Sequence, residues 1–219
     1  MRIEIERSIL DILPDFQIIA LSMDVLVTDS NIMNDAIIKY EQKTKEEYSL
    51  EDILNIPLIK EARDGYKKLG KDPSRYRLAC ESLLRRLVKG NQLYRINNVV
   101  DVGNLLSIDA NRSVAVLDYD KIQGDIKIRL GLETDVYEGI GRGIINVSNI
   151  PVYEDEVGPF GSTTSDTPRT MVTDNTKKIL LFIICFSDTY IAEHRQKAID
   201  LFTEYGYAKN IKELEVIKK

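Results

Sequence analysis

The chain has no tryptophan, a single histidine and only two cysteines among its 219 residues. A catalytic triad or a multi-histidine metal site would have to be built around His194, which we expect to be solvated or packed at an edge, because it stands in the charged stretch "AEHRQK". Cys80 and Cys185 provide no disulfide framework, so we expect free, packed thiols in a reducing compartment. The sequence therefore predicts no metal ion, no cofactor and a cytoplasmic location.

Long hydrophobic runs are also missing. The longest, "ILLFIICF" at 179–186, is too short to cross a membrane, which takes about 20 apolar residues in a helix. Its β-branched and aromatic side chains instead predict a strand that is buried on both faces. The N-terminal "MRIEIERSIL" has no charged leader followed by a long apolar core, so we expect neither a signal peptide nor a membrane partner.

A hydrophobic content of 43% and a charged content of 30% are typical of a folded globular protein. The first part of the chain predicts strands at 2–10 and 16–27, then a polar helix at 30–45. A helical region at 49–70 should be capped by Ser49 and kinked at Pro57.

Two more helices are predicted in the middle of the chain. The first has Asp72 as its cap, Pro73 in its first turn and Gly90 at its end. The second begins at Asn97 or Asn98, which are good capping residues, and turns Val99, Val102, Leu105 and Leu106 inward.

Beyond Asn111 the hydrophobic period changes from helical to two. Short alternating runs are separated by Gly, Asp and Asn, and "GIGRG" at 139–143 indicates a tight turn between strands. A final amphipathic helix is expected from Thr189 to about Tyr205, with the last residues trailing behind it. We therefore expect a single α+β domain over residues 1–219, with a helical middle and a β-rich, mixed-sheet second half.

Positive charge is concentrated in one segment. Residues 61–95 contain ten Lys or Arg and four acidic residues, a local charge of +6 in a chain whose formal net charge is -5. Such a segment is typical of a surface that binds one polyanionic partner, and Arg75, Arg85 and Lys89 are the candidate RNA contacts. Exposed helix faces also carry Lys and Arg without any partner, so charge alone leaves both interpretations open.

No GxSxG, Walker A or dinucleotide-binding motif is present. The loop "GPFGSTTSDTPRT" at 158–170 is rich in hydroxyls and ends with one acid and one arginine. It can wrap a ligand with backbone N–H groups and hydroxyls, or it can be a surface connection whose hydroxyls cap turns.

Three segments in order, "LGKDPSRYRLACESLLRRLVKGNQLYRINNVVDVGNLLSI", "LDYDKIQGDIKIRLG" and "TMVTDNTKKILLFII", resemble the B-three/B-four domain of the phenylalanyl-tRNA synthetase beta subunit. They are most similar to bacterial proteins made of that domain alone, and the core of the match covers about 64–187. In the synthetase this domain is the editing module, which hydrolyses the ester of tRNA mischarged with tyrosine.

The resemblance places Asn104 at the pocket asparagine of that family, and Ala115 where the synthetase has a histidine. The stretch "EGIGRG", with Glu138 and Arg142, corresponds to the region of the acid that reads the tyrosine hydroxyl. The family's Gly-rich pocket loop corresponds to "GPFGSTTSDTPRT". The resemblance thus implies the fold and the place of a pocket more directly than it implies tyrosine as the substrate.

The resemblance implies a site bounded by residues of both halves of the chain: Asn104, Glu138, Gly161, Ser165, Asp166 and Arg169. Asp166 and Arg169 would hold the two ends of an amino-acid-like ligand, or pair with each other, or only cap a turn and face solvent. The implied function is binding of tRNA or aminoacyl-tRNA, with hydrolysis of a mischarged ester by catalytic residues that the sequence does not identify. The alternative is a protein that binds an amino-acid-like small molecule without catalysis.

Overall fold

The computed structural model describes all 219 residues as a single α+β domain in which two sheets and a helical layer are stacked. The five-stranded sheet is mixed and has the order β11-β1-β4-β7-β8, and the four-stranded sheet has the order β10-β2-β9-β3. The five-stranded sheet consists of β1 (Ile3–Ile5), β4 (Ile126–Leu130), β7 (Pro151–Asp155), β8 (Gly158–Ser162) and β11 (Val216–Lys218). The four-stranded sheet consists of β2 (Gln17–Asp24), β3 (Val114–Asp118), β9 (Lys178–Cys185) and β10 (Lys209–Leu214).

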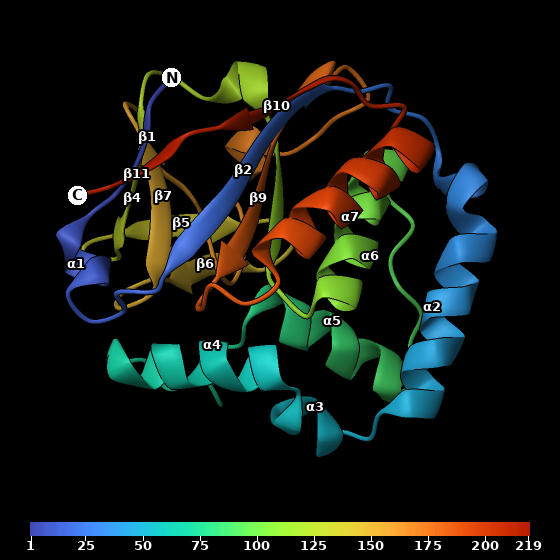
Figure 1. The fold of residues 1–219 in the computed structure, drawn as a ribbon, viewed down its shortest axis with the longest axis horizontal. Helices are drawn as coiled ribbons and strands as arrows, with labels where there is room; N and C mark the ends of the chain where they lie inside the picture. Colours follow the sequence, from blue (N-terminus) through green and yellow to red (C-terminus); the bar gives the residue numbers. More distant parts are fainter.

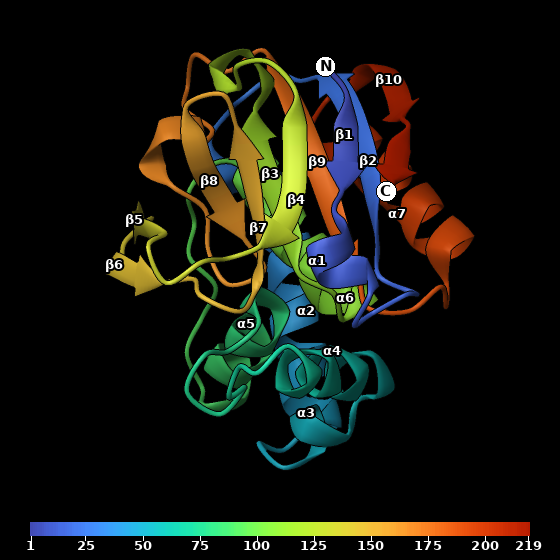
Figure 2. The same ribbon diagram turned by 90° about the vertical axis from the view of Figure 1, so that its left-hand side faces the viewer.

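Most of the helices lie to one side of the sheets and below them, and a separate hairpin projects beside α5 (Figures 1 and 2). Helices α6 and α7 cross the four-stranded sheet, whereas α3, α4 and α5 form a group at its lower end. The helices are α1 (Arg7–Leu10), α2 (Asn34–Glu47), α3 (Asp52–Asn55), α4 (Pro57–Lys68), α5 (Ala79–Val88), α6 (Asn98–Ala110) and α7 (Ile191–Tyr205). The hairpin is β5 (Val136–Gly139) and β6 (Gly143–Asn146), and short 3-10 turns lie at Ser30–Met33, Tyr119–Lys121 and Pro168–Thr170.

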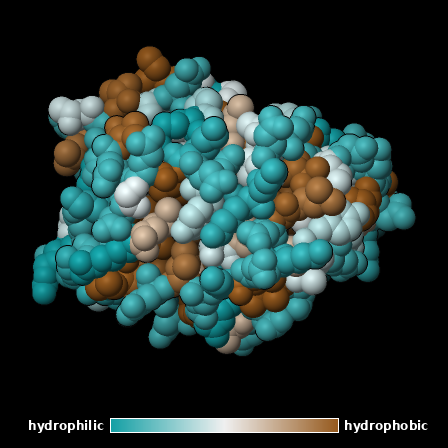
Figure 3. Space-filling model, turned by 90° about the horizontal axis from the view of Figure 1, so that it is seen from above, coloured by the Kyte–Doolittle hydropathy of each residue, from teal (hydrophilic) through white to brown (hydrophobic).

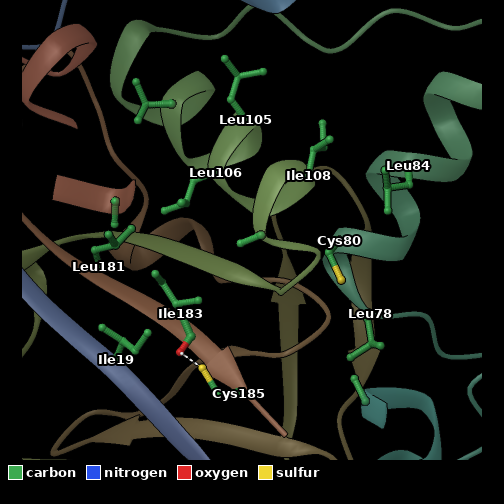
Figure 4. Close-up of a cluster of buried hydrophobic side chains, with 14 of the residues drawn as sticks. Ile19, Leu78, Cys80, Leu84, Leu105, Leu106, Ile108, Leu181, Ile183 and Cys185 are labelled. Carbon is green, nitrogen blue, oxygen red and sulfur yellow. Dashed lines mark hydrogen bonds between the residues drawn. The ribbon is translucent and has the colours of Figure 1, made fainter. Parts of the chain in front are cut away.

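Strand β9 is buried on both faces, as its sequence predicts. Ile183 and its alternate neighbours Ile179, Leu181 and Cys185 face the helices, where they pack with Leu105 and Leu106 of α6 (Figure 4). The intervening side chains Leu180, Phe182 and Ile184 lie between the two sheets. The alternation of side chains along one strand thus divides the core into two clusters.

The predicted helix signals in the middle of the chain are confirmed. Ser49 and Asp52 cap each other, because each backbone N–H donates to the other's side chain. Pro57 begins α4, where its missing N–H costs no hydrogen bond. Asn97 caps α6, its Oδ1 accepting from the N–H of Val100 at 2.9 Å.

Three boundary predictions are wrong. The strand expected at 2–10 covers only Ile3–Ile5, and Arg7–Leu10 form α1. Helix α5 begins at Ala79 rather than beside Asp72, because Asp72 caps a local turn at Ser74 and Leu78 is extended, with a ψ of 148°. The C-terminal residues do not trail behind α7. They form β10, which pairs with β2, and β11, which pairs in parallel with β1, and no local pattern foretold these long-range pairings.

His194 is buried, which corrects its predicted place at an edge or in solvent. Its Nδ1 accepts a hydrogen bond of 3.1 Å from Nε of Arg112, whose other end donates to the carbonyl of Thr189. Burial and the adjacent Arg112 charge lower the pKa of His194 to about 4. The histidine is therefore a neutral packing residue on α7.

No helix has the length and apolarity that a membrane crossing requires. The face seen from above is mostly hydrophilic, with separate small hydrophobic patches (Figure 3). Both cysteines are free and buried, as predicted.

Candidate functional site

A cleft lies between the helical group and the β half of the chain. Its polar arm, of about 370 Å³, is bounded by α5, α6, the tip of the β5–β6 hairpin and the loop after β8. A second recess, the apolar arm, of about 170 Å³, adjoins it. The two arms share four lining residues: Asn104, Val114, Ile140 and Asp166. Asn104 and Asp166 therefore stand where the polar and apolar arms meet.

Helix α6 carries Asn104 into the cleft, and its N-terminus is held firmly. Asn98 is fully buried, accepts from the N–H of Thr28 at 2.7 Å and donates to the carbonyls of Leu26 and Tyr205. Gly103 allows close packing on β3, because a Cβ there would meet the side chain of Val116 at 2.3 Å. The backbone that presents Asn104 is thus fixed by hydrogen bonds at one end and by packing beside it.

The loop after β8 supplies Ser165 and Asp166. Oγ of Ser162 donates to the carbonyl of Ser165 and accepts from the backbone N–H groups of Thr164 and Ser165. The same carbonyl accepts a 2.7 Å hydrogen bond from the hydroxyl of Tyr137, and the carbonyl of Asp166 accepts one from Ile140 N–H. The hydroxyl of Ser162 therefore orders the loop, and Tyr137 and Ile140 tie the loop to the hairpin.

Asp166 is the only carboxyl group that lines the cleft. Its Oδ1 is screened from solvent and has no hydrogen-bond partner. Burial raises the pKa of Asp166 to about 7, because the ionised form loses hydration and the backbone N–H of Ser162 offsets only part of that loss. A carboxyl group with such a pKa can exchange a proton near neutral pH.

Gly161 lies directly beneath this carboxyl group. A Cβ at position 161 would come within 2.5 Å of Asp166 Oδ1 and 2.7 Å of the ring of Tyr153. The hydroxyl of Tyr153 is also buried without a partner, and burial raises its pKa well above the usual value. Gly161 therefore packs behind Asp166 and does not itself line the cleft.

Arg169 does not share the cleft with Asp166. It forms a two-point ion pair with Asp155, with nitrogen–oxygen distances of 3.0 and 2.8 Å. Burial would raise the pKa of Asp155, but this pair and the backbone N–H groups of Gln123 and Val157 outweigh that effect and lower it. Arg169 was expected to hold one end of a ligand or to pair with Asp166. In the structure it instead holds its own segment against β7 through Asp155.

Glu138 is exposed on β5 and is absent from the cleft lining, although the hairpin tip beyond it is present through Ile140 and Arg142. Of the residues that the resemblance singled out, the structure therefore brings Asn104, Ser165 and Asp166 onto one cleft. It places Gly161 underneath them, and Glu138 and Arg169 elsewhere.

Several lining residues were not predicted as site residues. Arg86 of α5 donates to the hydroxyl of Tyr94 at 3.0 Å and its guanidinium lies 3.9 Å from the centre of that ring. Arg142 reaches the cleft from the hairpin turn. The one signal in the sequence was Arg142 in "GIGRG", because a charged residue in a tight turn is free to face a neighbouring element. No sequence pattern indicated that Arg86 and Tyr94 lie on the same cleft as Asn104.

The basic segment is partly neutralised within the fold. Arg63 and Arg85 both pair with the buried Glu81, at 2.8 and 3.8 Å. Arg75 and Lys89 are exposed and form no ion pair. Of the three candidate RNA contacts, two therefore remain fully available to a partner.

No group of three or more His, Cys, Asp and Glu side chains is arranged to hold a metal ion. The polar groups that line the cleft are one amide, several hydroxyls, two guanidinium groups and a single carboxyl.

The structure is thus an α+β domain with a cleft between its helical and β halves. The family model described as the B3/4 domain matches residues 61–211, more than half of the chain, and the chain belongs to this family.

Curated relatives are phenylalanine–tRNA ligase beta subunits. That of Bartonella quintana is 38% identical over 53 residues, covering 24% of this chain and 7% of that protein. That of Fusobacterium nucleatum is 24% identical over 127 residues, covering 57% of this chain and 16% of that protein. The chain thus spans a small part of the length of these relatives.

A similar solved structure is an N-terminal fragment of the phenylalanyl-tRNA synthetase beta subunit from Pyrococcus horikoshii. Its TM-score is 0.54 with 14% sequence identity, and the match covers 100% of this chain and 52% of that one. At this identity the likeness concerns the fold.

Proposed function

We propose that the cleft binds the aminoacyl end of tRNA and hydrolyses the ester that joins the amino acid to the ribose. The proposal is supported by membership of the B3/4 domain family and by the names of relatives that act on tRNA. The observation that carries it is the position of Asp166, the cleft's only carboxyl group, beside Asn104 where the two arms meet.

The chemistry follows from these groups. A water molecule adds to the ester carbonyl carbon while the Asp166 carboxylate takes its proton, and the carbonyl oxygen becomes an oxyanion. The side-chain amide of Asn104 and the hydroxyl of Ser165, which both line the cleft, are the donors that we assign to that oxyanion. When the carbon–oxygen bond breaks, the ribose oxygen receives the proton, which yields free amino acid and tRNA. None of these steps needs a histidine.

The exposed cations of the basic segment would guide the RNA. Arg75 and Lys89 lie at the two ends of the segment that contains α5, and α5 itself forms a wall of the cleft. Positive charge here would attract phosphates near the acceptor end, even though the chain as a whole is acidic. A tRNA-related function also implies a cytoplasmic protein.

The second candidate function is binding of an amino-acid-like molecule without hydrolysis. It is favoured by the inward direction of Asp166 Oδ1, which lies over Gly161 and leaves only one carboxylate oxygen for the cleft. Deacylation of a panel of mischarged tRNAs by the purified protein separates the two. Cleavage of at least one ester above the buffer rate supports the hydrolase, whereas amino acid binding with no ester cleaved supports the second candidate.

A further inference from the structure

Gly161 lies between Tyr153 and Asp166 in a short run of antiparallel pairing. It stands opposite Tyr153 of β7 on one side and opposite Asp166 on the other. Residues that are directly opposite each other in antiparallel pairs carry their side chains on the same face of the sheet. The side chains of Tyr153 and Asp166 therefore share one face, and the residue between them contributes no side chain.

The missing side chain at position 161 lets the other two approach each other. The point that a Cβ would occupy lies 2.5 Å from Oδ1 of Asp166 and 2.7 Å from the ring of Tyr153. Both side chains thus lean over the glycine from opposite sides. The carboxyl group and the phenol ring occupy adjacent space there.

Packing explains the ring of Tyr153 but not its hydroxyl. The residue is fully buried, and its ring centre lies 5.3 Å from that of Phe182 and 6.1 Å from that of Phe160. A phenylalanine would make the same aromatic contacts. The Tyr153 hydroxyl is buried without a hydrogen-bond partner, and so is Oδ1 of Asp166. Such atoms are rare in folded proteins, because each gives up hydration and receives nothing in exchange.

Two other tyrosines that contact the loop after β8 already use their hydroxyls. Tyr66 of α4 is hydrogen-bonded to the hydroxyl of Thr163, and Tyr137 of β5 donates to the carbonyl of Ser165. Both therefore hold the loop itself. The hydroxyl of Tyr153 is a donor that neither the loop backbone nor the aromatic packing uses.

We propose that Tyr153 is a positioning residue for Asp166, and that its hydroxyl donates to Oδ1 when the carboxyl group is ionised. One charge-assisted hydrogen bond then gives each of the two atoms the partner that it lacks. The space over Gly161 allows the carboxyl group to turn toward the phenol. The catalytic meaning of this pair rests on the proposed function, in which the ionised Asp166 is the base.

The pair acts on the protonation of the cleft's only carboxyl group. A hydrogen bond to the charged form of a carboxyl group favours that form. Tyr153 therefore holds the pKa of Asp166 below the value that burial would give without the phenol. The phenol itself stays protonated near neutral pH, because burial raises its pKa well above the usual value.

The remaining titratable groups around Asp166 are the same in all the variants compared below. Arg86, Arg142 and Tyr94 line the cleft in front of it. Tyr137 lies on the hairpin side, and burial raises the pKa of its phenol. A change in the pKa of Asp166 between variants therefore reports the hydroxyl that was removed.

NMR titration of the Asp166 carboxyl carbon, in the whole chain labelled with carbon-13 aspartate, tests the proposal. The signal is assigned by its loss in Asp166→Asn. In Tyr153→Phe the pKa of Asp166 should rise by about one unit, a ten-fold change in the ionisation constant, because a hydrogen bond to a charged group is lost. Tyr66→Phe removes a hydroxyl that bonds the same loop and not Asp166, so this matched control should leave the pKa of Asp166 unchanged.

Thr167→Val is the competing variant, because Oγ1 of Thr167 is also buried without a partner. A rise in the pKa of Asp166 that occurs in Tyr153→Phe and not in Thr167→Val supports the proposal. Equal titration of Asp166 in the parent and in Tyr153→Phe, or a rise in Thr167→Val instead, would overturn it.

Unfolding melts give a second measurement that needs no NMR assignment. Tyr153→Phe should lose stability relative to the parent as pH rises through about 7, since only the ionised carboxyl group loses its hydrogen bond. The two proteins should differ least in acid, where Asp166 is protonated. A stability difference that stays constant with pH would contradict the pairing.

These outcomes are independent of whether the protein is a hydrolase. If Asp166 titrates as described and no ester is cleaved, the proposed function fails and the pairing of Tyr153 with Asp166 stands. If esters are cleaved and Asp166 titrates identically in the parent and in Tyr153→Phe, the proposed function stands and the pairing fails.

Discussion

The carboxyl group of Asp166 lies so close to Gly161 that a Cβ at position 161 would come within 2.5 Å of Oδ1. Gly161→Ala must therefore move Asp166 or the ring of Tyr153, which lies 2.7 Å from the same point. We expect a loss of about 1–3 kcal/mol in the free energy of unfolding from overpacking. We also expect ligand affinity or deacylation to fall at least ten-fold, because the shifted carboxyl group lines the cleft.

Gly90→Ala is the control for that stability loss. Gly90 has a φ of 85° and no atom within 4 Å of an added Cβ, so the substitution strains only the backbone, by about 1–2 kcal/mol. Denaturant melts and binding measured on both variants separate the two effects. If Gly161→Ala binds ligand like Gly90→Ala, Gly161 is no support for Asp166.

Asp166 should make stability depend on pH in an unusual direction. Its pKa is about 7 in the folded protein against 3.8 ordinarily, so the folded chain holds a proton that the unfolded chain releases. This contribution to stability is complete below about pH 4, is lost as pH rises toward 7 and is absent above it. Asp166→Asn should therefore gain stability relative to the parent between pH 4 and 8, by about 2 kcal/mol or more at 1.4 kcal/mol per pKa unit. A constant difference across denaturant melts in this range would contradict the raised pKa.

Activity should change with pH in the opposite direction. If Asp166 acts as the base, the ionised form is the active one, and the rate of ester hydrolysis should rise through about pH 7 and then level off. Initial rates between pH 5 and 8, corrected for spontaneous hydrolysis, give this profile. If the rate of ester hydrolysis rises in proportion to hydroxide concentration in both the parent and Asp166→Asn, Asp166 is not the base.

Arg169 should matter for stability and not for ligand. Arg169→Ala leaves the buried Asp155 carboxylate with backbone donors only, at a cost of about 1–3 kcal/mol. Because the pair lowers the pKa of Asp155, the stability it supplies is present above pH 4 and is lost as the carboxylate protonates in acid. Unfolding at pH 3 and pH 7 checks this. If Arg169→Ala loses ligand binding while its stability is unchanged, Arg169 contacts the ligand and this account of its role is wrong.

The RNA surface is best tested with exposed cations. Arg75→Glu with Lys89→Glu should weaken tRNA binding and flatten the plot of log affinity against log salt by about 0.7–0.9 per lost phosphate contact. Arg85 is less suitable, because it pairs with Glu81 and a second acid there would destabilise α5. Lys39→Glu with Lys45→Glu, two exposed lysines of α2, is the matched control. Equal affinity and equal salt slope in all three proteins would exclude the segment from the interface.

The fold was predictable where local chemistry decides it. The apolar run of β9, the capping pair of Ser49 and Asp52 and the cap at Asn97 each satisfy their own backbone or bury their own side chains. Strands β10 and β11 were not predictable, because they are edge strands whose partners lie about two hundred residues away in the chain.

The cleft shows the same division. The resemblance correctly predicted that Asn104 and the loop of Asp166 line one cleft. Arg169 was assigned to the site because it is close to Asp166 in the sequence, but it pairs with Asp155 at the end of β7. Arg86 and Tyr94 join the site only because α5 packs against α6, which a pattern within one helix does not reveal.

The most direct test of the central claim is single-turnover deacylation of a panel of aminoacyl-tRNAs by the parent and by Asn104→Ala. Asn55→Ala, an exposed asparagine on α3, controls for a general effect of the substitution. We predict that the parent and Asn55→Ala cleave at least one ester well above the buffer rate and that Asn104→Ala loses about 10²–10³-fold, as removal of an oxyanion donor does. Cleavage of no ester by the parent, or equal rates in Asn104→Ala and Asn55→Ala, would contradict the account.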